Sequence, residues 1–175
     1  MESFPLAGFR NIGNTCFMNS ALQIFMLFED LLNFLEEGDH EAKILRVVNW
    51  LKKVYDEEKL VNPAPLKDEM GKKNKKFKGF AQEDSQEFLL ELLDYIEESL
   101  QKEYKTEEKD SIEENIISEL FDTKVKTILK SKETEEKSIN IEPNRFLLFS
   151  LSEQTTNLNN CLSEYIKKEL LDGDN

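Results

Sequence analysis

Residues 8–23 read GFRNIGNTCFMNSALQ, and they join a glycine-containing turn directly to the start of a predicted helix. Gly13 allows backbone conformations that other residues avoid, and Asn14 and Thr15 carry side-chain oxygens of the kind that cap helix N-termini. Apolar residues then recur at helical spacing: Phe17, Met18, Ala21, Leu22, Phe25, Met26 and Phe28. The pattern therefore places Cys16 in the first turn of a helix.

A cysteine at the N-terminus of a helix is a candidate nucleophile. Unpaired N–H groups and the positive end of the helix dipole favour the thiolate there, and the thiolate is the nucleophilic form of the side chain. Asn11, on the preceding turn, is placed to donate an amide N–H to an oxyanion formed at Cys16. The alternative interpretation is a buried core thiol, because free cysteines are often fully buried. The turn by itself leaves both interpretations open.

Composition restricts the class of protein and its partners. The chain has 175 residues, with 23 Lys and Arg against 36 Asp and Glu, so its formal net charge is −13. This length suits one domain, and this charge suits a basic partner and disfavours general binding to nucleic acid or to anionic membranes. The two cysteines, Cys16 and Cys161, are too few for a disulfide scaffold. Because no leader pattern or membrane-length apolar run is present, we expect a soluble protein in the cytoplasm, the nucleus or both.

Hydrophobic periodicity outlines the remaining elements. It predicts helices over residues 28–37, 41–58, 80–104 and 158–171, strands over 123–129 and 138–141, and a third strand over 145–151 as an option. Pro63 and Pro65 interrupt the helical pattern. The following stretch, residues 67–78, has six lysines and two acidic residues, and is predicted to be a solvated loop rather than a site for an acidic ligand. Cys161 falls on the apolar face of the last helix and is expected to be a small core residue.

A second segment, residues 79–89, reads GFAQEDSQEFL and opens the longest predicted helix with acidic residues. By itself it is an ordinary amphipathic helix whose acidic start suits the helix dipole. Together, the two segments resemble the Cys box and the Gln/Asp/Glu box of the ubiquitin-specific protease family, a group of papain-like cysteine deubiquitinases. The matching positions are Gly8, Asn11, Gly13, Asn14, Thr15, Cys16, Phe17, Met18, Asn19, Ser20, Leu22 and Gln23, followed by residues 82–89.

The resemblance implies roles for five residues. Cys16 aligns with the nucleophile and Asn11 with the oxyanion-stabilising position. Gln82, Asp84 and Glu87 align with residues beside the active-site cleft, where the carboxylates meet the basic tail of ubiquitin. The implied activity is deubiquitination, so ubiquitin and ubiquitinated proteins are the expected partners.

The fold implied by the resemblance is α+β, of the papain-like cysteine peptidase type. Residues 1–104 would form a helical thumb with both boxes, residues 105–115 a charged linker, and residues 116–175 an incomplete β-containing fingers region. The palm would be absent, which leaves a single truncated catalytic domain. Many family members hold zinc in the fingers through two Cys-x-x-Cys pairs, but residues 130–137 contain no cysteine. We therefore expect no structural zinc and no other cofactor.

The catalytic histidine of the family has no match in this chain. In the family this base lies far downstream in a Gly-His-Tyr context, and an Asp or Asn orients it. The one histidine here, His40, follows Cys16 by 24 residues and lies between two acidic residues, so we expect it to be exposed and not paired with Cys16. Deleting the base costs about a millionfold in turnover in another hydrolase, so this chain alone is expected to be inactive or nearly so.

Three interpretations of function follow. The chain is a truncated or mispredicted reading frame of a deubiquitinase, a non-catalytic ubiquitin-binding remnant, or a helical interaction protein in which both boxes are coincidental. A thumb face left without its palm would expose apolar surface and favour a further partner. Ubiquitin binding that survives Cys16→Ala without any turnover would identify the remnant, and a lack of affinity for ubiquitin would identify the interaction protein.

Overall fold

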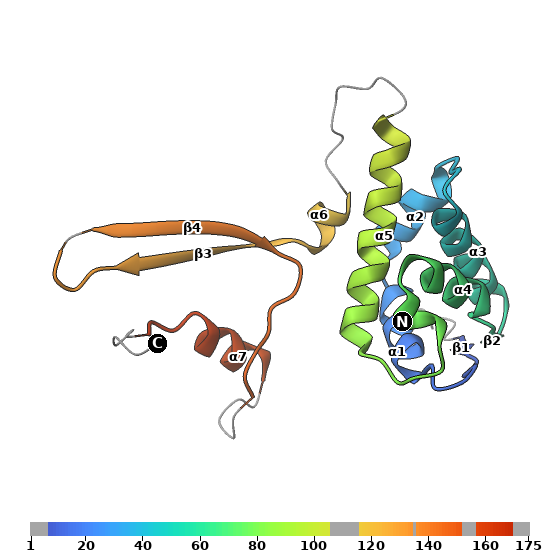
Figure 1. The fold of residues 1–175 in the computed structure, drawn as a ribbon, viewed down its shortest axis with the longest axis horizontal. Helices are drawn as coiled ribbons and strands as arrows, with labels where there is room; N and C mark the ends of the chain where they lie inside the picture. Colours follow the sequence, from blue (N-terminus) through green and yellow to red (C-terminus); the bar gives the residue numbers. More distant parts are fainter. Residues whose placement is uncertain (1–6, 106–115, 135, 152–156, 170–175) are drawn as a thin grey trace, which may run out of the picture. The chain divides into compact units, whose positions relative to one another are not determined.

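The computed structural model describes residues 7–105, 116–134, 136–151 and 157–169. These residues form two compact units that divide after Leu120 (Figure 1). The first unit is helical apart from one short ladder, and the second combines a β-hairpin with a helix, so the chain belongs to the α+β class. No helix within the described ranges is long and apolar enough to cross a lipid bilayer.

Helices dominate the first unit, and the longest of them, α5 (Ser85–Lys105), packs against α1 and α3 (Figure 1). The helical elements besides α5 are α1 (Cys16–Phe25), α2 (Glu29–Glu37), α3 (Lys43–Glu57), α4 (Ala64–Lys73), the 3-10 helix η1 (Lys75–Lys78) and α6 (Ile116–Phe121). Two short strands, β1 (Gly8–Phe9) and β2 (Leu60–Val61), pair in parallel. This ladder ties the segment before Cys16 to the segment after α3.

Three phenylalanines from separate elements meet in the core of the first unit. Phe17 of α1, Phe77 of η1 and Phe88 of α5 pack with their ring centroids 5.2–6.2 Å apart. Phe77 and Phe88 are almost completely buried. Aromatic rings that meet edge to face, as Phe88 does with both neighbours, add stability beyond the area they bury. Because Phe17 directly follows Cys16, the cluster anchors the start of α1 to η1 and α5.

The second unit is built on a β-hairpin. Strand β3 (Thr123–Lys130) pairs antiparallel with β4 (Lys137–Asn144), in a register that sets the first residue of β3 opposite the last residue of β4. Nearly every side chain of the two strands is exposed. At the open end of the hairpin, Arg145 Nε donates a hydrogen bond of 2.9 Å to Asp122 Oδ1.

Helix α7 (Leu158–Tyr165) follows the hairpin and is shorter than predicted. Cys161 is buried on this helix, so its predicted core position is confirmed. The optional third strand over residues 145–151 does not form, and the sheet in this part of the chain has two strands among the described residues. The predicted linker residues 106–115 and the last predicted helical residues, 170–171, lie outside the described ranges.

The predictions from helical periodicity are confirmed for α1, α2, α3 and α5, and the alternating pattern is confirmed for the hairpin. The prediction of a loop over residues 67–78 is wrong, because the stretch lies mostly within α4 and η1. Pro63 and Pro65 stand at the N-terminal end of α4, where a missing N–H breaks no helical hydrogen bond. Lys72 and Lys73 lie in its last turn, where positive charge suits the dipole.

Glu69 of α4 makes the stability of the first unit sensitive to acid. Burial raises the pKa of this carboxyl, but hydrogen bonds from Lys72 and Tyr95 and the charges of Lys72 and Lys43 outweigh burial and lower it. A carboxyl with a pKa lowered by folding stabilises the protein above its unfolded pKa, and the stabilisation is lost as pH falls through the folded pKa.

Replacing the Glu69 carboxyl should therefore lower the free energy of unfolding at neutral pH and not in acid. Glu69→Gln is expected to lower the free energy of unfolding by about 1 kcal/mol at neutral pH. The difference from wild type should shrink as the pH falls below the ordinary glutamate value, as measured by urea denaturation at several pH values. Glu57→Gln, at an exposed position on α3, is the control and should leave the free energy of unfolding at neutral pH close to that of wild type. A difference that stayed constant with pH would contradict the assignment.

Candidate active site

Helix α1 presents Cys16 as its first residue, with the side chain exposed. The turn before it contains two residues with positive φ, Gly13 at 109° and Asn14 at 50°. A Cβ atom on residue 13 would lie 2.7 Å from Cδ1 of Phe80. Glycine is therefore required here for two reasons, the backbone conformation and the aromatic ring that packs against it.

Asn11 holds this turn together. Its Oδ1 accepts hydrogen bonds from the backbone N–H groups of Gly13 at 3.1 Å and Thr15 at 3.3 Å. The Thr15 hydroxyl accepts the N–H of Ile12 at 3.1 Å, and Thr15 is fully buried. Within the described ranges the amide nitrogen of Asn11 has no hydrogen-bond partner, and the oxygen alone holds the turn.

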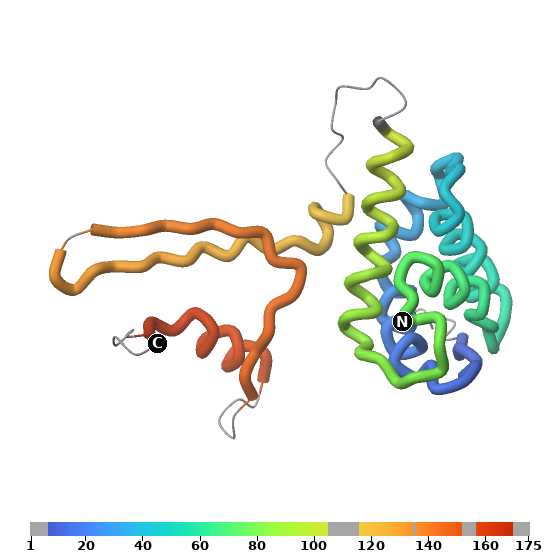
Figure 2. The backbone as a smooth tube through the Cα atoms, viewed as in Figure 1, coloured from blue at the N-terminus to red at the C-terminus, as the bar shows by residue number. Residues whose placement is uncertain are grey.

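The segment that precedes α5 lies against this turn. Cys16 Sγ donates to Gln82 Oε1 at 3.5 Å, and Asn14 Nδ2 donates to the Phe80 carbonyl at 2.8 Å. Each contact joins residues that are 66 positions apart in the chain. In Figure 2 the green backbone leading into α5 passes beside the blue start of α1. Of the residues singled out by sequence, the structure thus brings Cys16 and Gln82 together directly.

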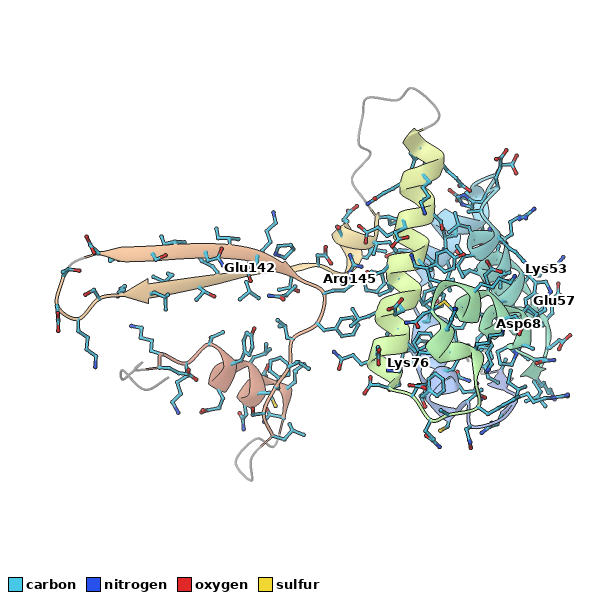
Figure 3. All side chains as sticks on the ribbon, viewed as in Figure 1. Lys53, Glu57, Asp68, Lys76, Glu142 and Arg145 are labelled. Carbon is cyan, nitrogen blue, oxygen red and sulfur yellow. The ribbon has the colours of Figure 1, made fainter. Side chains whose placement is uncertain are left out.

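The two carboxylates, Asp84 and Glu87, are engaged within the chain. Asp84 caps α5, because its Oδ1 accepts the backbone N–H of Glu87 at 2.9 Å. The Glu87 carboxylate pairs with the Lys76 ammonium, which also lies 3.3 Å from Glu83 Oε2 near the N-terminal end of α5 (Figure 3). The hydrogen bonds to Glu87 and Glu83 raise the pKa of Lys76. A cationic ligand at Glu87 would have to replace Lys76.

Lys67 contacts the segment that leads to Gln82, and the sequence did not point to it. It was expected in a solvated loop, yet it is buried on α4, and its ammonium donates to the backbone of the segment that leads to Gln82. The available signal was the spacing of Leu66 and Met70, which lie four residues apart on the buried face of α4. Lys67, next to Leu66, falls at the edge of that face.

His40 lies near the opposite end of α5 from Cys16. The prediction of an exposed side chain is wrong, because only 5% of it is exposed and Nδ1 lies 2.8 Å from Glu103 Oε2. Burial raises the pKa of Glu103, but hydrogen bonds from the Ala42 N–H and from His40 outweigh burial and lower it. The helix between Ser85 and Glu103 is about 27 Å long at 1.5 Å per residue. His40 is therefore a structural partner of Glu103, and it does not pair with Cys16.

Comparison with known proteins identifies the family. The family model described as ubiquitin carboxyl-terminal hydrolase matches residues 7–168. Ubiquitin carboxyl-terminal hydrolase Usp2 of Drosophila melanogaster is 30% identical over 207 residues, which cover 99% of this chain and 22% of that protein. Ubiquitin carboxyl-terminal hydrolase 4 of Bos taurus is 34% identical over 111 residues, which cover 55% of this chain and 12% of that protein.

A third relative, ubiquitin carboxyl-terminal hydrolase 2 of Bos taurus, is 26% identical over 210 residues, which cover 97% of this chain and 34% of that protein. The matched part thus spans 12–34% of the length of these three relatives. The family match extends over both units of the structure, and the resemblance predicted from the two boxes is confirmed. The chain belongs to the ubiquitin carboxyl-terminal hydrolase family.

Proposed function

We propose that this chain is the nucleophile-bearing part of a cysteine deubiquitinase that acts in the cytoplasm, the nucleus or both. The observation that carries the proposal is the 3.5 Å contact between Cys16 Sγ and Gln82 Oε1, which joins the two boxes. Membership of a family of ubiquitin carboxyl-terminal hydrolases supports it. In this proposal residues 1–104 act as the thumb of a papain-like domain, 105–115 as a linker and 116–175 as part of the fingers.

The proposed chemistry begins when Cys16 attacks the carbonyl carbon of the C-terminal glycine of a conjugated ubiquitin. A sulfur–carbon bond forms, the amine leaves with a proton, and water then hydrolyses the thioester and regenerates the thiol. The side-chain N–H groups of Asn11 and the backbone N–H of Cys16 stabilise the oxyanion. Asp84 and Glu87 accept the basic residues of the ubiquitin tail, and Gln82 lies beside the reacting sulfur.

Turnover also requires a base that takes the thiol proton and returns it to the leaving amine. His40 is engaged with Glu103 at the far end of α5, so it does not serve this purpose. We therefore propose that this chain by itself reacts once at most, and that full turnover needs a base supplied by another part of the enzyme or by another polypeptide. The chain would still bind ubiquitin and present Cys16 to it.

An intact-mass assay with ubiquitin that carries a C-terminal electrophile tests this function. We expect a one-to-one adduct with the full chain, because the electrophile replaces the scissile carbonyl and needs no leaving-group proton. The adduct should be absent from Cys16→Ala and unchanged in Cys161→Ala, since Cys161 is buried in the second unit. A folded sample that bound ubiquitin without forming the adduct would favour a non-catalytic binding module, and a folded sample with no affinity for ubiquitin would contradict both.

A further inference from the structure

Lys67 has a side chain that is almost entirely withdrawn from solvent. The residue is 8% exposed on α4, although lysine is rarely buried unless its ammonium is hydrogen-bonded. Its Nζ donates to the backbone carbonyls of Gly79 at 2.7 Å and Lys78 at 3.2 Å. The ammonium therefore binds the backbone where the chain leaves η1 and turns toward α5.

The same ammonium lies over the ring of Phe80, with Nζ 5.3 Å from the ring centroid. A cation over an aromatic face is attracted by the electron density of the ring. Phe80 is 71% exposed, so few other contacts hold it. Its ring lies against Gly13, and its backbone carbonyl accepts a hydrogen bond from the Asn14 amide. Lys67 and the Cys16 turn thus both contact Phe80.

Gln82 lies two residues after Phe80 and reaches Cys16 Sγ through its Oε1. We propose that Lys67 is a positioning residue for the Cys16 site. It acts by fixing residues 79–82 so that the Gln82 side chain meets the sulfur. The proposal depends on the proposed function only in treating Cys16 as the reactive group, and it is tested without ubiquitin.

Helix α4 supplies a matched control for this proposal. Lys73 lies over the ring of Tyr95 with Nζ also 5.3 Å from the ring centroid, and it pairs with Glu98 of α5. Lys73→Met therefore removes from the same helix a contact between an ammonium and an aromatic ring, as Lys67→Met does. It leaves the hydrogen bonds to Lys78 and Gly79 intact. An effect found in Lys67→Met and not in Lys73→Met is therefore due to the loss of the Lys67 contacts with residues 78–80.

The experiment measures the rate at which iodoacetamide alkylates Cys16 in the full chain, with peptide mapping to separate Cys16 from Cys161. We expect Gln82→Ala to increase this rate about threefold, because the side-chain oxygen no longer accepts the thiol hydrogen or shields the sulfur. Lys67→Met should give a similar increase, whereas Lys73→Met should react as wild type does. The double variant Lys67→Met/Gln82→Ala should react no faster than Gln82→Ala, because Lys67 acts through Gln82.

Amide hydrogen exchange over residues 79–82 provides a second readout, and it should be faster in Lys67→Met than in Lys73→Met. Unchanged hydrogen exchange over residues 79–82 in Lys67→Met would overturn the proposal. Two alkylation results would also overturn it: additive rate increases from Lys67→Met and Gln82→Ala, or a Gln82→Ala alkylation rate equal to that of wild type. A chain that showed the expected alkylation pattern and yet formed no ubiquitin adduct would contradict the proposed function and support the role of Lys67.

Discussion

Replacing Phe88 with alanine is expected to lower the free energy of unfolding of the first unit by about 3–5 kcal/mol. The Phe88 side chain is completely buried, and its ring meets Phe17 and Phe77 edge to face with centroids 5.8 and 5.2 Å away. Alanine would remove both aromatic contacts and leave a cavity between α1, η1 and α5. These elements are rigidly packed, so collapse around the cavity would recover only part of the loss.

Urea denaturation of the full chain, followed by far-ultraviolet circular dichroism, measures this effect. Phe80→Ala is the matched control, because it removes the same side chain from a position that is 71% exposed. The control should cost less than about 1 kcal/mol, which is the size of an exposed contact between a cation and a ring. Equal losses in Phe88→Ala and Phe80→Ala would show that the aromatic cluster is not the core that fixes the start of α1.

Replacing Gly13 with alanine adds a single methyl group, yet it is expected to slow the reaction of Cys16 with a ubiquitin electrophile strongly. The backbone φ of 109° is one that alanine adopts only with strain, at a cost of about 1–3 kcal/mol. The new Cβ would also lie 2.7 Å from Cδ1 of Phe80, so the ring or the turn must shift. Either shift would weaken the Asn14–Phe80 hydrogen bond and move Gln82 away from the sulfur.

The rate of adduct formation with the ubiquitin electrophile should fall at least about tenfold, which corresponds to 1.4 kcal/mol. The reason is that a shifted turn moves Asn11 and Cys16 out of line with the bound ubiquitin tail, and this loss outweighs the gain in thiol reactivity from losing the Gln82 contact. Gly8→Ala is the matched control, because Gly8 has no positive φ and a Cβ there would lie 3.6 Å from Leu60 Cδ1, an ordinary contact. Adduct formation at the wild-type rate by Gly13→Ala, with Gly8→Ala equally fast, would contradict the requirement for glycine at position 13.

Much of the fold follows from local patterns in the sequence. The four predicted helices of the first unit and the two strands of the hairpin have clear periods of 3.6 or 2, and these periods report local structure directly. Helix α4, which was missed along with η1 and α6, carries two prolines at its start and lysines at its end, and both features are typical of loops as well as of helix ends. The parallel ladder of β1 and β2 has two residues in each strand, which is too short for any alternation to appear.

The residues of the candidate site differ in how well the sequence predicted them. The resemblance pointed to both boxes, and the sequence Asp84-Ser85-Gln86-Glu87 also has the spacing of a helix capping box, which accounts for the position of Asp84. The burial of His40 was not accessible, because its partner Glu103 lies 63 residues away. The burial of Lys67 was missed although the spacing of Leu66 and Met70 indicated a buried helix face, because the carbonyls that its ammonium binds lie beyond its own helix. The catalytic and substrate-binding roles themselves stay predictions.

The contacts that join the Cys16 turn to the segment before α5 also set the order in which the site forms. Asn14 meets Phe80, and Cys16 meets Gln82, across 66 residues of chain. Closing a loop of that length loses more entropy than forming helical hydrogen bonds between residues four apart, so contacts between distant residues form more slowly. During refolding the helical signal should therefore return before Cys16 gains its native surroundings. We therefore expect a newly made chain to form its helices before the contact between Cys16 and Gln82 is in place.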